Sequence, residues 1–205
     1  MERALNRYAR MVPVWAVWLG GMIPLALLVF DTLTNRLGID PVRDIEHRLG
    51  RTALYFLIAT LLVTPVLRLT RVNLIRFRRA LGLITFTYAV LHVAAWIGFD
   101  MGLVWSQMLR DVVKRPYLIF GMVAFVILIA LAVTSNNASI RKMGSGGWRR
   151  LHKLIYIAAP VAALHWLWAL KVWEVKPLAI LAVILALLAL RVVVPRPLGR
   201  KPARA

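Results

Sequence analysis

The sequence predicts an all-α integral membrane protein, in which residues 1–205 form a single domain of six spanning helices with both termini in the cytoplasm. Hydrophobic residues make up 61% of the chain, and they recur in apolar runs of about 20 residues, the length of a membrane-crossing helix. No segment alternates with a period of two, which excludes a β-barrel. Basic residues gather in the short connections between the apolar runs, which predicts how the bundle is oriented.

The expected spans are residues 12–30, 45–67, 81–99, 116–133, 151–170 and 177–194. The first follows a basic residue as a signal peptide would, but no small-residue cleavage site comes after Phe30, so we expect it to be retained. The second is short in strictly apolar terms, and we expect its helix to begin near Ile45.

The last three spans have recognisable boundaries. Pro116 and Pro177 suit the first turn of a helix, where a missing N–H costs nothing. The fourth span ends at the polar run 134–137, and Pro160 interrupts the fifth. The eight tryptophans, Trp96 among them, lie mostly near span ends, and we interpret most of them as interface anchors.

The charge pattern predicts the orientation. Eighteen of the 27 Lys and Arg residues fall at the N-terminus, in the second and fourth connections and in the C-terminal tail, whereas seven of the eight acids fall on the opposite side. The positive-inside rule therefore places both termini in the cytoplasm. A net charge of +19 placed beside anionic lipid indicates a lipid bilayer and not a nucleic acid as the partner. The absence of cysteine excludes iron–sulfur clusters, thiolate zinc sites and covalently attached heme.

All four histidines lie in, or at the ends of, apolar stretches. Ionisable side chains in a membrane usually mark a functional site, and imidazole is a common axial ligand of heme iron. At 1.5 Å of rise per residue, His92 lies roughly 16 Å and His165 roughly 21 Å from the cytoplasmic ends of their helices. We therefore predict that His92 and His165 bind one b-type heme from two facing helices. The alternative is that both are hydrogen-bonded packing residues.

His152 and His47 allow more than one interpretation. His152 lies about 20 Å from His165 along the helix and could bind a second heme, although the two side chains point about 140° apart on an ideal helix. The matching position on the third span is Arg78, and an interfacial role for His152 stays open. His47 and Arg51, at the outer surface, could contact a quinone or a heme propionate, or could simply be interface residues.

Several segments resemble one known family. They are Asp44-Ile45-Glu46-His47 with Gly50-Arg51-Thr52-Ala53-Leu54, then Tyr88-Ala89-Val90-Leu91-His92, Leu151-His152-Lys153-Leu154-Ile155-Tyr156 and Leu164-His165-Trp166-Leu167-Trp168. Together they resemble the heme-binding membrane subunits of bacterial protein-methionine-sulfoxide reductase systems, the MsrQ/YedZ family, within the ferric reductase-like transmembrane superfamily. The resemblance covers nearly the whole chain.

This resemblance implies a multi-pass protein of the bacterial inner membrane that carries one or two b-type hemes on His92, His152 and His165, and that is associated with FMN. It also implies electron flow from the quinone pool to a periplasmic molybdopterin subunit that reduces methionine sulfoxide in oxidised proteins. The chain would then be an electron-transfer subunit and not the catalytic one. It contains no G-x-G-x-x-G fingerprint for a nucleotide of its own.

Two other classes of function stay open at this stage. A metalloreductase would use the same heme to pass electrons to external ferric or cupric ions. A non-redox membrane scaffold or transporter would use the histidines for packing, although no obvious internal repeat or pair of broken helices indicates a transporter.

Overall fold

A computed structural model describes residues 2–170 and 174–194, and helices account for 87% of them. The α-helices are α1 (Glu2–Met11), α2 (Val14–Leu33), α3 (Pro41–Thr70), α4 (Ile75–Ala95), α5 (Trp105–Lys114), α6 (Pro116–Val133), α7 (Asn137–Leu151), α8 (Ile155–Ala169) and α9 (Val175–Val193). A π-helical turn, η1 (Trp96–Asp100), extends α4, and a 3-10 turn, η2 (His152–Leu154), joins α7 to α8. No strand occurs in the described ranges, so the prediction of an all-α protein is confirmed.

Five helices are long and apolar enough to cross a membrane, which makes the chain a multi-pass membrane protein. They are Val14–Leu33, Pro41–Thr70, Ile75–Asp100, Pro116–Val133 and Val175–Val193. The remaining expected span, 151–170, corresponds to η2 and α8, and α8 has only 15 residues. The count of six spans and the cytoplasmic position of both termini therefore stay predictions.

The helices differ from the expected spans mainly at their ends. α3 starts before the expected span because the Asp40 side chain accepts a hydrogen bond from the Arg43 N–H (3.1 Å) and Pro41 occupies the first turn. Three helices, α1, α5 and α7, were not predicted. Each has 15 residues or fewer and carries many polar residues, so a search for long apolar runs does not detect them.

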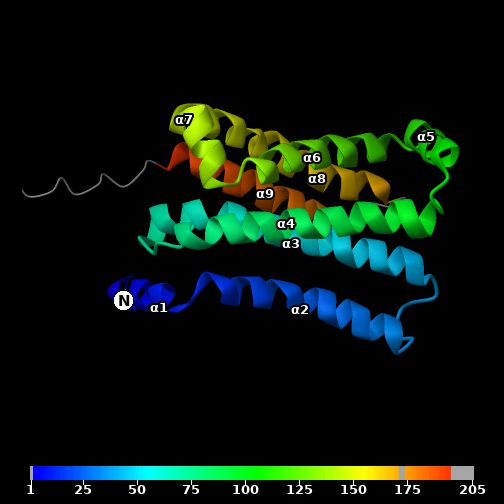
Figure 1. Cartoon of the computed structure of the whole chain (residues 1–205), viewed down its shortest axis with the longest axis horizontal. Coiled ribbons are helices and arrows are strands. Elements are labelled where there is room, and N and C mark those ends of the chain that lie inside the picture. The colour runs from blue at the N-terminus through cyan, green and yellow to red at the C-terminus, as the bar shows by residue number, and fades with distance from the viewer. Residues whose placement is uncertain (1, 171–173, 195–205) are drawn as a thin grey trace, which may run out of the picture.

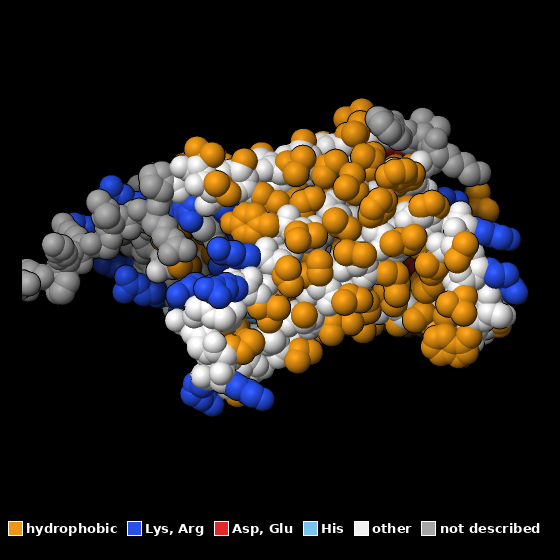
Figure 2. Space-filling model, turned by 90° about the horizontal axis from the view of Figure 1, so that it is seen from above, with side chains coloured by type: hydrophobic (Ala, Val, Ile, Leu, Met, Phe, Trp, Pro, Cys, Tyr) orange, Lys and Arg blue, Asp and Glu red, His pale blue; other side chains and the backbone are white. Residues whose placement is uncertain are grey.

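The long helices lie side by side along one axis (Figure 1). α3 packs most extensively against α4, α6 packs against α8, and α9 contacts both α3 and α8. α2 flanks the other side of the α3–α4 pair. Figure 2 shows a face covered by hydrophobic side chains between two ends where Lys and Arg gather. Leu19 and Ile23 of α2 are 62% and 57% exposed, as expected for side chains that face lipid.

The Tyr88 hydroxyl of α4 forms hydrogen bonds with two backbone groups of α2 beside Pro24. The Tyr88 hydroxyl donates to the Gly21 carbonyl (2.7 Å) and accepts from the Leu25 N–H (3.0 Å). In a regular helix these two backbone groups would bond to each other, so the hydroxyl is inserted into the hydrogen-bond ladder at the proline. This contact fixes α4 against α2.

Arg191 of α9 has a similar role at Pro65 of α3. Proline has no N–H, so it leaves the carbonyl of Leu61, four residues earlier, without its helical partner. The Arg191 side chain, only 6% exposed as a residue, donates to the Leu61 carbonyl (2.6 and 3.0 Å) and to that of Thr60 (3.0 Å). Arg68 of α3 in turn donates to the carbonyls of Arg191 and Val194 at the end of α9. These arginines therefore join α3 to α9, in addition to any contribution of their charge to membrane orientation.

Replacing Arg191 with methionine is expected to destabilise the bundle by about 2–4 kcal/mol, because two buried carbonyls lose charge-assisted hydrogen bonds. The measurement is the thermal unfolding midpoint in detergent, compared with the same substitution at the exposed Arg150. An unfolding midpoint equal to that of the Arg150→Met control would contradict this role of Arg191.

Candidate functional site

A cavity of about 750 Å³ lies between the α3–α4 pair and the α6–α8 pair. Its inner walls are apolar and include Leu54, Leu57 and Leu128. The opposite end is polar, where arginines, acids and aromatic residues from the starts of α3 and α6 and the end of α4 line the opening. It is called the outer end below, because the sequence predicts that it lies on the side away from the cytoplasm. The cavity volume falls within the range of roughly 300–1,000 Å³ that is usual for cofactor sites.

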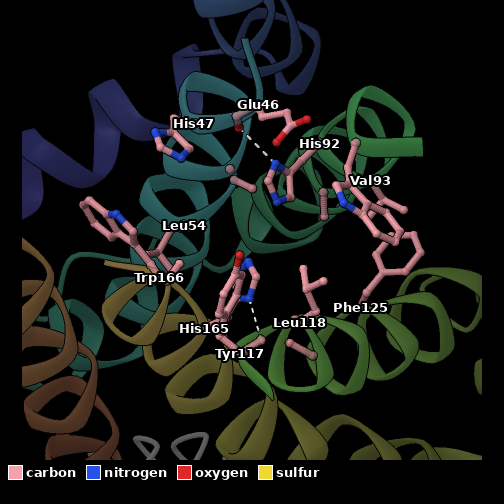
Figure 3. Close-up of a pocket in the computed structure, with 18 of the residues that line it drawn as sticks. Glu46, His47, Leu54, His92, Val93, Tyr117, Leu118, Phe125, His165 and Trp166 are labelled. Carbon is pink, nitrogen blue, oxygen red and sulfur yellow. Dashed lines mark hydrogen bonds between the residues drawn. The ribbon is translucent and has the colours of Figure 1, made fainter. Parts of the chain in front are cut away.

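His92 of α4 and His165 of α8 project into this cavity from opposite sides and face each other (Figure 3). Their ring centroids lie 6.2 Å apart, with an angle of 69° between the ring planes. The sequence analysis expected the two histidines at compatible depths on facing helices, and the structure places both rings in one cavity.

Backbone carbonyls orient both imidazoles. Nδ1 of His92 lies 2.9 Å from the Glu46 carbonyl oxygen, and Nδ1 of His165 lies 2.8 Å from the Tyr117 carbonyl oxygen. A carbonyl oxygen can only accept, so each Nδ1 carries the proton and donates it. Each neutral ring therefore keeps a free lone pair on Nε2, the nitrogen available to a metal. A metal-binding histidine typically shows this Nδ1–H to carbonyl contact.

Two glycines allow the imidazoles to lie against the neighbouring helices. A Cβ atom on Gly50 of α3 would lie 3.2 Å from two ring atoms of His92. A Cβ atom on Gly121 of α6 would lie 2.9 Å from Nδ1 and 3.0 Å from Cε1 of His165. The two carbonyl contacts and the two glycine contacts thus hold the rings from behind.

The geometry fits a metal shared by the two histidines. Metal–nitrogen bonds of about 2 Å on both sides would put the imidazole ring centres about 6 Å apart, as they are here. Among the described residues no cluster of three or more His, Cys, Asp or Glu side chains could bind a metal ion by itself. Two imidazoles would suffice to hold a heme, because the porphyrin itself would supply the other iron ligands.

The structure places His152 away from this pair. It lies in η2 and is stacked on Trp148, with ring centroids 3.8 Å apart. Its Nε2 lies 3.2 Å from the Thr134 hydroxyl oxygen, and Trp148 donates to the Thr134 carbonyl (2.9 Å). His152 does not line the cavity. Its role as a heme ligand stays a prediction.

His47 and Arg51 both line the outer end of the cavity. The Arg51 Nε donates to the His47 carbonyl (3.1 Å), and this hydrogen bond holds the Arg51 side chain against α3. Their contact with a quinone or a propionate stays a prediction.

The sequence analysis missed several cavity residues, among them Trp96 and Glu46. Trp96 was interpreted together with the interface anchors, but it lines the cavity, and its Nε1 is buried. Glu46 was noted only as part of a motif, but its carbonyl orients His92 and its Oε1 is buried in the same cavity. One signal was available for Trp96: it follows His92 by four residues, so both lie on one helix face.

Fold and site together define the class of protein: a multi-pass helical membrane protein with a cofactor cavity between two histidine-bearing helices. Residues 49–163 match the family model described as ferric reductase like transmembrane component. The chain is 44% identical over 190 residues to the protein-methionine-sulfoxide reductase heme-binding subunits MsrQ of Brucella ovis, Brucella canis and Brucella suis. Each alignment covers 93% of this chain and 86% of the relative.

The chain therefore belongs to the MsrQ family of heme-binding subunits, within the ferric reductase-like transmembrane proteins. The resemblance given by the sequence motifs is thus confirmed. No solved structure matches the chain.

Proposed function

We propose that this chain is a b-type cytochrome of the bacterial inner membrane that transfers electrons from the quinone pool to a periplasmic molybdopterin methionine-sulfoxide reductase subunit. Its role would be the repair of oxidised periplasmic proteins, with six spans and both termini in the cytoplasm. One observation carries the proposal: two neutral imidazoles, His92 and His165, face each other across a cavity at the spacing that a shared iron requires. The names of the relatives support both the heme and the reductase partner.

His92 and His165 would hold the heme, which supplies one-electron chemistry between ferric and ferrous iron. The carbonyls of Glu46 and Tyr117 keep both imidazoles in the tautomer that presents Nε2 to the cavity. The inner wall is apolar, which favours a low-dielectric environment around the heme. The chain itself needs no group with acid–base or nucleophilic chemistry for this function.

The finer assignments rest on the family resemblance. A second heme on His152 would require its Nε2 to leave the Thr134 hydroxyl. His47 and Arg51 stand at the outer opening, where a quinone or a propionate would meet the cavity. An association with FMN is supported only by the resemblance.

A reduced-minus-oxidised absorption spectrum of the purified full-length chain, with heme measured per chain, tests the proposal. We expect the signal of a low-spin b-type heme at one or two equivalents. If wild type and His152→Ala both contain one heme per chain, His152 is not a heme ligand. A colourless and well-folded protein would contradict the proposed function and favour a non-redox scaffold or transporter.

The match to ferric reductase-like proteins favours a second candidate, a metalloreductase that reduces external ferric or cupric ions. The same heme would serve either acceptor. Reoxidation of the reduced protein by a periplasmic reductase subunit, but not by chelated ferric ion, would support the first function. The reverse result would support the second.

A further inference from the structure

The cavity has an apolar end and a polar end, as an amphipathic ligand requires. Towards the inner side, its walls include Leu54, Leu57 and Leu128, with no charged group among the described lining residues there. All of the charged lining residues belong to the outer end: Asp40, Arg43, Glu46, Arg51, Asp100 and Arg115. Heme has the same division, because its two carboxylates lie on one edge and the rest of its rim is apolar.

Two buried polar atoms at this site have no hydrogen-bond partner among the described residues: Nε1 of Trp96 and Oε1 of Glu46. Buried donors and acceptors are almost always paired, and leaving one unpaired costs about 1–3 kcal/mol. Both atoms belong to residues that line the histidine cavity. The indole N–H can only donate, and no described protein atom accepts from it.

The backbone places Trp96 at the outer side of His92. Trp96 begins the π-helical turn η1, one helical turn beyond His92 towards the outer opening. Asp100, at the end of η1, also lines the cavity. Short π-helical segments inside α-helices often occur at functional sites, because they change which side chains share a face.

We propose that Trp96 is a positioning residue that donates its Nε1–H to a carboxylate of the heme, so that the carboxylate edge faces the outer opening. This inference rests on the proposed function. The opposite orientation would put two carboxylates among Leu54, Leu57 and Leu128, where burial of unpaired charge is prohibitive.

The charges of the opening are compatible with this orientation. Arg51 and Arg115 line the opening, and Arg115 also pairs with Asp111 (3.0 Å). In total three arginines offset three acids there, so the carboxylates meet no net negative charge. A hydrogen bond to a carboxylate is about twice as strong as one between neutral groups, which is what makes a single indole N–H effective.

The test compares heme with heme dimethyl ester, in which both carboxylates are masked. The detergent-purified full-length chain, produced under heme limitation, is titrated with each compound, and binding is followed by the absorption of the bound heme. Wild type is expected to prefer heme over the ester by about tenfold or more, the effect of a charge-assisted hydrogen bond. Trp96→Phe keeps the aromatic ring but removes the donor, and should lose most of this preference.

Two further variants make the result specific. Trp166→Phe is the matched control, because Trp166 lines the same cavity but its nitrogen is not among the buried unpaired atoms. It should keep the wild-type preference. Arg51→Gln, at the opening, should also reduce the preference, and it does not depend on the folding of a Trp96 variant.

The outcomes separate the inference from the proposed function. A wild-type chain that binds neither compound refutes the proposed function. A wild type that binds heme and ester equally, or a Trp96→Phe variant with the wild-type preference, overturns the orientation while the heme assignment stands. Loss of preference in Trp96→Phe but not in Trp166→Phe supports it.

Discussion

His92→Ala and His165→Ala are each expected to abolish binding of the heme, with occupancy falling at least about tenfold below wild type. Each substitution removes one of the two imidazoles that face each other across the cavity, and among the described residues no group of three or more His, Cys, Asp or Glu side chains could bind a metal ion in its place. His47→Ala is the matched control, because it removes an imidazole that lines the same cavity at its outer end. That variant should keep the heme.

The measurement is heme per chain together with the reduced-minus-oxidised spectrum. In a His165→Gly variant, added imidazole should restore part of the low-spin signal, because the cavity then has space for a free ligand. Rescue by imidazole separates a lost ligand from a misfolded chain. Full heme in both alanine variants would refute the assignment of the pair.

The long helices could be predicted from the sequence because membrane crossing depends on local composition. A run of about 20 apolar residues is visible without knowledge of its neighbours, and the ends of α6 and α9 fall within two residues of the expected spans. The short helices α1, α5 and α7 lack that signal. α8 shows the limit of the method, because its apolar stretch begins with a 3-10 turn and leaves an α-helix of only 15 residues.

The histidine pair could be predicted because depth in a membrane follows from a constant rise per residue. The residues that support the pair could not. Glu46, Tyr117 and Gly121 act through backbone atoms or through the absence of a side chain, on helices other than those of the histidines. Such contacts depend on which helices are neighbours, and one sequence alone does not show this.

His152 illustrates the opposite case. Its separation from His165 along the chain suggested a second ligand, while the angle between the two side chains argued against a shared face. In the structure His152 is stacked on Trp148 and hydrogen-bonded to Thr134, outside the cavity, and its role as a ligand stays a prediction. Arg191 was counted only as a topogenic charge, because its target, the Leu61 carbonyl freed by Pro65, lies 130 residues away in sequence.

Gly121→Ala is expected to weaken heme binding by about 10–100-fold, the usual effect of disturbing the support of a metal-ligating histidine. The new Cβ would lie 2.9 Å from Nδ1 of His165, and this ring cannot move away without losing the Tyr117 carbonyl. Heme affinity is measured by titration, with Gly20→Ala in α2 as the control, since a Cβ there meets nothing within 4 Å.

Heme affinity and the stability of the bundle should change in opposite directions if the new Cβ disturbs the histidine and does not weaken the helix. Alanine stabilises a helix relative to glycine by about 0.8–1 kcal/mol, so Gly121→Ala and Gly20→Ala should both favour the folded bundle. Only the first should lose heme. Gly50→Ala should fall between them, because its Cβ would approach His92 to 3.2 Å, a contact that a small shift can relieve. An order of heme affinities other than Gly20→Ala, then Gly50→Ala, then Gly121→Ala would show that these glycines do not support the imidazoles.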